Sequence, residues 1–95
     1  MNDKPHPLAP LRAEIDAIDE AMVRLLARRA EVVARVAQVK AREGIPAFIP
    51  ERVEEVVAHA RNTAASEGLD PALAETVWRA MIGWFVDWEA RELKG

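Results

Sequence analysis

The chain has 95 residues, a formal net charge of −3, 51% hydrophobic residues and no cysteine. This length indicates a single domain that buries roughly 60–65% of its unfolded surface, so a partner subunit would add stability. The lack of cysteine excludes disulfides and thiolate zinc sites, and no histidine has metal-ligand spacing. The negative charge argues against broad nucleic-acid binding, and no apolar run is long enough to span a membrane. We therefore expect a cytoplasmic protein that contacts neither nucleic acid nor membrane.

Residues 1–7 are polar and proline-rich, which predicts a disordered lead-in to a single helical domain over residues 8–95. From Leu8 to about Arg42 there is no glycine, and Pro10 stands where the first helical turn tolerates it, so one long helix is predicted. Its apolar residues alternate at steps of three and four, and Arg29 fills the one position that they skip. This apolar seam consists of Leu8, Leu11, Ile15, Ile18, Met22, Leu25, Val32, Val36 and Val39.

Two shorter helices follow the long one. The second is predicted over residues 50–66, between the stop signal at Gly44 and a capping glycine at Gly68. The third is predicted over residues 71–93, after the cap signal at Asp70. Because the first helix is ~50 Å long, the other two cannot cover its seam, and a second copy of the chain is the expected cover. The predicted fold is all-α, with three helices per chain in an intertwined homodimer.

Arg29 and Lys40 are the notable cations of the first helix. An unpaired guanidinium in an apolar seam costs several kcal/mol by order of magnitude, so an anion should meet Arg29. That anion is either a carboxylate of a neighbouring helix or a bound ligand. Lys40 follows eleven residues later on the same face, from which both side chains could lean toward one ligand. Alone, it would be a solvated charge.

Glu89 is predicted to lie on an apolar face of the third helix, in register with Trp78, Ile82 and Phe85. A buried glutamate tends to be protonated and can then donate a hydrogen bond. The alternative is an ion pair with a lysine or an arginine. The tryptophans Trp78, Trp84 and Trp88 are predicted to be core residues, whereas His6 and His59 are predicted to lie on the surface.

These residues belong to an ordered pattern that covers nearly the whole chain. It runs through residues 11–19 (LRAEIDAID), residues 25–29 (LLARR), Lys40 and residues 50–52 (PER). The pattern resembles the all-helical chorismate mutase family and, equally, its isochorismate pyruvate lyase relatives.

The resemblance implies a domain-swapped dimer with two active sites, each built from both subunits. By position, Arg12 would reach the partner's site, Arg29 would grip a substrate carboxylate and Lys40 would sit at the breaking ether bond. Arg52 would line the pocket, and Glu89 would take a third-helix position that is often glutamine. The expected catalytic residues are Lys40, Glu89 and Arg29. The expected substrate-binding residues are Arg12, Arg29, Lys40, Arg52 and Phe85.

The predicted function is therefore chorismate mutase, acting on a small dianionic substrate without a cofactor. Two positions depart from the mutase pattern, because Ile49 and Val53 stand where many mutases keep acidic residues for the ring hydroxyl. Isochorismate pyruvate lyase is accordingly the alternative, although Glu89 argues against it, and a mutase for the 4-amino analogue is a third possibility. A non-catalytic helical dimerisation module, with Arg29, Lys40 and Glu89 in an internal salt-bridge network, is the alternative outside the enzymes.

Overall fold

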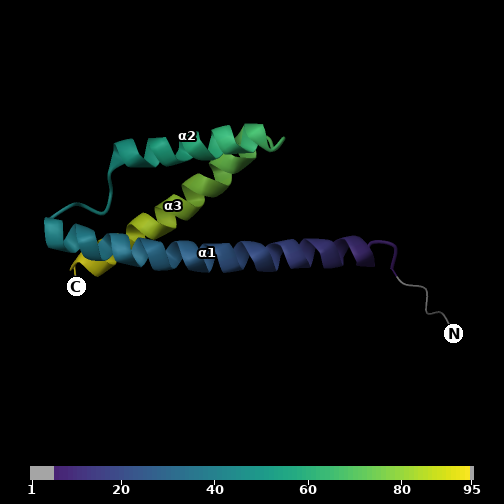
Figure 1. The fold of residues 1–95 in the computed structure, drawn as a ribbon, viewed down its shortest axis with the longest axis horizontal. Helices are drawn as coiled ribbons and strands as arrows, with labels where there is room; N and C mark the ends of the chain where they lie inside the picture. The colour runs from purple at the N-terminus through teal and green to yellow at the C-terminus, as the bar shows by residue number, and fades with distance from the viewer. Residues whose placement is uncertain (1–5, 95) are drawn as a thin grey trace. The chain divides into compact units, whose positions relative to one another are not determined.

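A computed structural model describes residues 6–94, which form three helices. They are α1 (Ala9–Glu43), α2 (Pro50–Ser66) and α3 (Pro71–Lys94), and Figure 1 shows their order along the chain. No strand occurs within residues 6–94, so the all-α prediction is confirmed and the helix bounds agree to about one residue. The predicted lead-in lies mostly outside the described residues. None of the helices in the described part is both long and apolar enough to cross a membrane.

Two glycines end α1 and α2 in the same way. Gly44 and Gly68 have positive φ angles of 69° and 75°, which glycine adopts without steric cost. After each glycine the chain doubles back, and the next N–H donates to a carbonyl of the last helical turn. Ile45 N donates to the Lys40 carbonyl at 2.9 Å, and Leu69 N donates to the Ala64 carbonyl at 2.8 Å. Both ends therefore carry the six-to-one hydrogen bond of a Schellman motif.

The starts of α2 and α3 use the expected residues. Pro50 occupies the first turn of α2, and Glu51 lies in that turn, where the helix dipole favours a negative charge. In α3, the Asp70 side chain accepts a hydrogen bond from Ala72 N at 2.9 Å and so caps the helix. The cap signals in the sequence are thus confirmed.

The chain divides into two compact units, one ending at Val32 and the other beginning at Val33. In the second unit, α2 and α3 lie side by side near the turn that joins them, and α3 ends beside the last turns of α1 (Figure 1). Ala60, Ala64 and Ala74 are buried together, with Trp78 packed against them. Alanine at these positions lets the two helix backbones approach closely, because no long side chain separates them.

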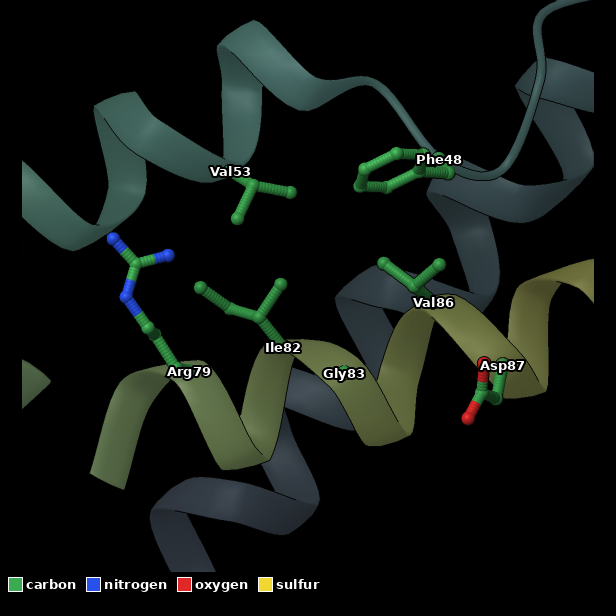
Figure 2. Close-up of a pocket in the computed structure, with 7 residues that line it drawn as sticks. All are labelled: Phe48, Val53, Arg79, Ile82, Gly83, Val86 and Asp87. Atoms are coloured by element: carbon green, nitrogen blue, oxygen red, sulfur yellow. The ribbon is translucent and has the colours of Figure 1, made fainter. Parts of the chain in front are cut away.

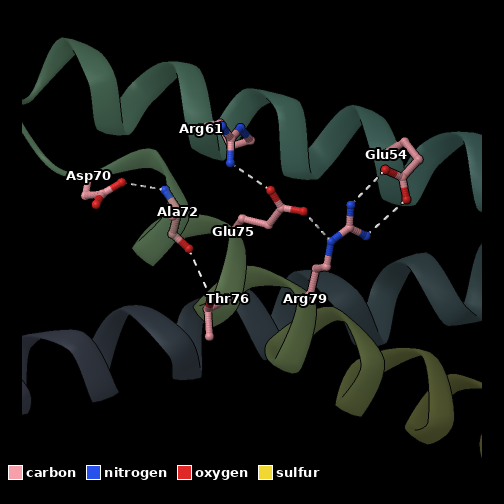
Figure 3. Close-up of polar contacts among 7 residues, drawn as sticks. All are labelled: Glu54, Arg61, Asp70, Ala72, Glu75, Thr76 and Arg79. Carbon is pink, nitrogen blue, oxygen red and sulfur yellow. Dashed lines mark hydrogen bonds and ion pairs between the residues drawn. The ribbon is translucent and has the colours of Figure 1, made fainter.

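A network of ion pairs joins α2 to α3 on their exposed surface (Figure 3). Arg79 of α3 donates to both carboxylate oxygens of Glu54 on α2, at 2.9 and 3.1 Å, and to Glu75 at 2.7 Å. Glu75 accepts a further hydrogen bond from Arg61 of α2 at 2.7 Å. The hydrogen bonds from Arg79 lower the pKa of both glutamates, and these carboxylates raise the pKa of Arg79.

The apolar seam of α1 is exposed. Its residues are 41–59% exposed in the chain. Trp84 is also 59% exposed, so its assignment to the core is wrong, whereas Trp78 and Trp88 are half-buried. The reason is helical geometry: Trp84 follows the buried Ile82 by two residues, which places it on the opposite side of α3.

Candidate functional site

Lys40 and Glu89 form a nearly buried ion pair in the second unit. Lys40 Nζ, in the last turns of α1, lies 2.9 Å from Glu89 Oε1, near the end of α3. The two side chains are 14% and 8% exposed. A charge this far from water needs a partner, and each group supplies one for the other. The ion-pair alternative for Glu89 is therefore confirmed.

The Lys40 ammonium has a second partner in the loop between α1 and α2. Its Nζ donates a hydrogen bond to the main-chain carbonyl of Ala47 at 3.0 Å. The ammonium thus lies between two oxygen atoms, Glu89 Oε1 at 2.9 Å and the Ala47 carbonyl oxygen at 3.0 Å. An ammonium has three N–H donors. Lys40 therefore retains an N–H group that could donate to a ligand.

The other predicted site residues lie in different surroundings. Arg12 and Arg29 belong to the first unit, where Arg12 is exposed and Arg29 is half-buried. They are seventeen residues apart on α1, which is ~25 Å along the axis, so they cannot hold one small ligand within one chain. Arg52 on α2 is exposed, and its Nη1 lies 3.8 Å from Glu55 Oε1.

Phe85 on α3 is half-buried, and its ring meets that of Trp84 edge-on, with 5.2 Å between the ring centroids. Lys40 and Glu89, both predicted catalytic residues, are in contact in the structure.

A shallow hollow of about 200 Å³ lies between α2 and α3 (Figure 2). Val53 of α2 and Ile82 of α3 point toward each other across it, and Phe48 lies near Val86. Arg79 lines one end, where its guanidinium is already engaged by Glu54 and Glu75. Val53 offers no acceptor to a hydroxyl group, whereas Asp87, which also lines the hollow, carries a carboxylate.

Two contacts of this region were not predicted from the sequence. The carbonyl of Ala47 is a main-chain atom, and no residue type signals its use. The Glu54–Arg79 contact joins residues twenty-five apart, so only the packing of the two helices reveals it. The Glu75–Arg79 pair was not predicted either, although its i,i+4 spacing, which stabilises a helix surface, is a signal that the sequence offers.

Comparison with known proteins identifies the family. The model of the chorismate mutase type II family matches residues 11–90, and the chain belongs to this family. The T-protein of Enterobacter agglomerans is 43% identical over 75 residues, which is 79% of this chain and 20% of that protein. The 4-amino-4-deoxychorismate mutase of Streptomyces venezuelae is 36% identical over 79% of this chain and 73% of its own. The isochorismate pyruvate lyase of Pseudomonas aeruginosa is 36% identical over 83% of this chain and 77% of its own.

The chain spans about a fifth of the T-proteins that it matches and 59% of the 4-amino-4-deoxychorismate mutase of Streptomyces pristinaespiralis. The resemblance seen in the sequence is thus confirmed at the level of the family. Membership alone does not choose among reactions, since these relatives carry different names.

Proposed function

We propose that the chain is a chorismate mutase, which converts chorismate to prephenate by a Claisen rearrangement. The observation that carries this proposal is the buried Lys40–Glu89 pair at 2.9 Å, in a chain of this family. A cation and a carboxyl group held together away from water are strong electrostatic groups, because low solvent access reduces screening.

The reaction suits a site made of cations. The rearrangement is unimolecular, so the enzyme has to hold the substrate in its compact conformer and stabilise negative charge on the ether oxygen. It needs neither a nucleophile nor a cofactor. Arg29 would hold one carboxylate with its planar fork, and Lys40 would donate to the ether oxygen. Arg52 and Phe85 would line the substrate pocket.

Glu89 would serve as the second donor to the ether oxygen. In that role it must be protonated, because a carboxylate has no proton to donate. In its ionised form it would instead neutralise Lys40, whose Nζ lies 2.9 Å from Glu89 Oε1. Substrate turnover would therefore require a proton on Glu89, with Lys40 directed toward the ligand.

The proposal includes a homodimer with shared sites. The exposed apolar seam of α1 and the exposed Trp84 are surfaces that a second copy could bury. An antiparallel partner would bring Arg12 of the partner subunit to Arg29, which resolves the ~25 Å separation within one helix. The expected location of such an enzyme remains the cytoplasm.

Isochorismate pyruvate lyase is the second candidate, and the apolar side chains of Ile49 and Val53 favour it. Both are half-buried, and Val53 lines the hollow of Figure 2. Apolar side chains at these two positions would offer the ring hydroxyl of chorismate no acceptor. The lyase of P. aeruginosa and the 4-amino-4-deoxychorismate mutase of S. venezuelae are both 36% identical to the chain, so both substrates belong in the test.

The deciding experiment offers the purified protein chorismate, isochorismate and 4-amino-4-deoxychorismate separately and compares the values of kcat/KM. Preferred formation of prephenate from chorismate is the expected result. Salicylate with pyruvate from isochorismate would identify the lyase, and preference for the amino substrate would identify the third reaction. Turnover of none of them, with no rise in Tm from a bicyclic transition-state mimic, would indicate a non-catalytic dimerisation module.

A further inference from the structure

The loop between α1 and α2 touches Lys40 twice. Ile45 N donates to the main-chain carbonyl of Lys40 at 2.9 Å, and the carbonyl of Ala47 accepts from its side-chain Nζ at 3.0 Å. Both ends of the segment from Ile45 to Ala47 are therefore hydrogen-bonded to Lys40. The first contact depends on Gly44, whose φ of 69° turns the chain back toward the helix that it has just left.

The Ala47 contact gives the ammonium its direction. A lysine side chain has a flexible four-carbon stem, so its charged end has many positions unless other groups restrict it. Two groups restrict it here: Glu89 Oε1 of α3 lies 2.9 Å from the ammonium nitrogen, and the neutral carbonyl of Ala47 accepts a hydrogen bond from it at 3.0 Å. Without that carbonyl, Glu89 would be the remaining described partner, and the ammonium would be drawn toward α3.

We infer that Gly44 is a positioning residue: its left-handed backbone places the Ala47 carbonyl, and this carbonyl aims the Lys40 ammonium. The inference rests on the proposed function in so far as the aimed group acts on substrate. Gly44 has no side chain that could contact Lys40. The space around it is open, since an added Cβ would meet no atom within 4 Å. A substitution at Gly44 therefore acts through the backbone angle alone.

The structure provides a matched control in Gly68. This glycine ends α2 with a φ of 75°, carries the same type of hydrogen bond and likewise has no atom within 4 Å of the position that a Cβ would take. Its loop leads to α3 and supplies no contact to Lys40 in the described residues. Gly44→Ala and Gly68→Ala thus impose the same backbone strain, and differ in whether that strain reaches Lys40.

The test measures Lys40 directly and by activity. The chain has three lysines, Lys4, Lys40 and Lys94. Labelling with an amine-specific reagent, followed by peptide mass spectrometry, therefore compares the labelling rate of Lys40 with the rates of the other two lysines. We expect the labelling rate of Lys40 to rise several-fold in Gly44→Ala and to stay at the wild-type rate in Gly68→Ala. We expect kcat to fall about tenfold or more in Gly44→Ala, with a much smaller change in KM, because misplacement of one group weakens transition-state contacts. Gly44→Asn should recover most of both readouts, since asparagine tolerates the left-handed region.

The outcomes separate the inference from the proposed function. Equal effects of Gly44→Ala and Gly68→Ala on Lys40 labelling and on kcat per folded molecule would overturn the positioning role. So would unchanged Lys40 labelling in Gly44→Ala, even if its Tm fell. A specific rise in Lys40 labelling in a protein that turns over none of the three substrates would support the positioning of Lys40 and reject the proposed function.

Discussion

Lys40 and Glu89 come from opposite ends of the second unit's sequence and meet at 2.9 Å, with side chains that are only 14% and 8% exposed. Removal of one member would leave the other charged group without its partner in a dry environment, which is costly. The pair therefore joins the last turns of α1 to α3, and the same two groups are the proposed donors to the ether oxygen.

The cations are expected to act on the transition state. Lys40→Ala and Arg29→Ala should each lower turnover by at least ~10²-fold, the scale of losing one oriented donor. Arg42→Ala is the control for Lys40, since Arg42 is an exposed cation in the same last turn of α1 and should leave turnover unchanged. Steady-state kinetics, corrected for the folded fraction by circular dichroism, provide the measurement. Loss of stability with normal turnover per folded molecule would indicate structural ion pairs instead.

Glu89 is expected to act as a hydrogen-bond donor to the ether oxygen. A protonated carboxyl group can donate, and glutamine keeps the shape and supplies an amide donor. Glu89→Gln should therefore retain turnover, whereas Glu89→Ala should lower it by ~10²-fold, the scale of losing one oriented donor. Steady-state kinetics of the two variants, corrected for the folded fraction, provide the measurement. Equal turnover of Glu89→Gln and Glu89→Ala would show that Glu89 is not a donor.

The ion-pair network of Figure 3 should contribute to stability above acidic pH. Hydrogen bonds from Arg79 lower the pKa of Glu54 and Glu75 below the usual 4.5. The unfolded chain therefore takes up protons first as the pH falls, so the contribution is complete above about pH 4.5 and is lost as the pH falls through the folded-state values.

Urea midpoints of wild type and Arg79→Gln should accordingly differ at neutral pH and converge at acidic pH. Because these groups are exposed, the difference should be small and should shrink at high salt. Arg91→Gln, an exposed arginine of α3 outside the network, should show neither trend. A gap between Arg79→Gln and wild type that stays constant with pH would point to lost packing of the arginine stem.

Assembly should be required for a stable fold, because the apolar seam of α1 is 41–59% exposed in the chain. Sedimentation velocity at micromolar concentration should reveal a dimer and no folded monomer. Ile18→Glu, in the middle of the seam, should weaken the dimer, whereas Glu20→Gln at a neighbouring exposed position should not. A compact and active monomer would contradict the shared-site proposal.

Subunit mixing tests whether one site uses both chains. Arg12→Ala and Arg29→Ala proteins should each be nearly inactive, since every site then lacks one of the arginines that would bind the substrate. Refolded together in equal amounts, they should form some mixed dimers with one intact site and one doubly altered site. Activity should therefore return to about a quarter of the wild-type value if subunits exchange at random. Mixtures as inactive as the parents, with exchange verified by mass spectrometry, would argue against shared sites.

The sequence predicted the helices well because their signals are local. Gly44, Gly68 and Asp70 act on the nearest turns, and their observed conformations and hydrogen bonds match that expectation. The burial of Glu89 was also predictable, since its spacing from Ile82 places both on one face of α3.

Other features depended on packing that no local pattern encodes. Trp84 was assigned to the core on residue type, yet its position relative to Ile82 turns it outward. The pairing of Glu54 with Arg79 depends on how α2 and α3 align, and the identity of the partner of Glu89 depends on where α3 ends beside α1. Spacing fixes a side chain's direction around its own helix, but it does not fix what the helix meets.

The contact between Ala47 and Lys40 has a consequence for mutational surveys. Every residue at position 47 supplies the same carbonyl oxygen, so a library that varies this position would score it as permissive although it contacts a proposed catalytic group. A main-chain contact leaves no trace in the side chain that makes it. Its trace lies three residues earlier, at Gly44, where tolerance to substitution would be governed by a backbone angle.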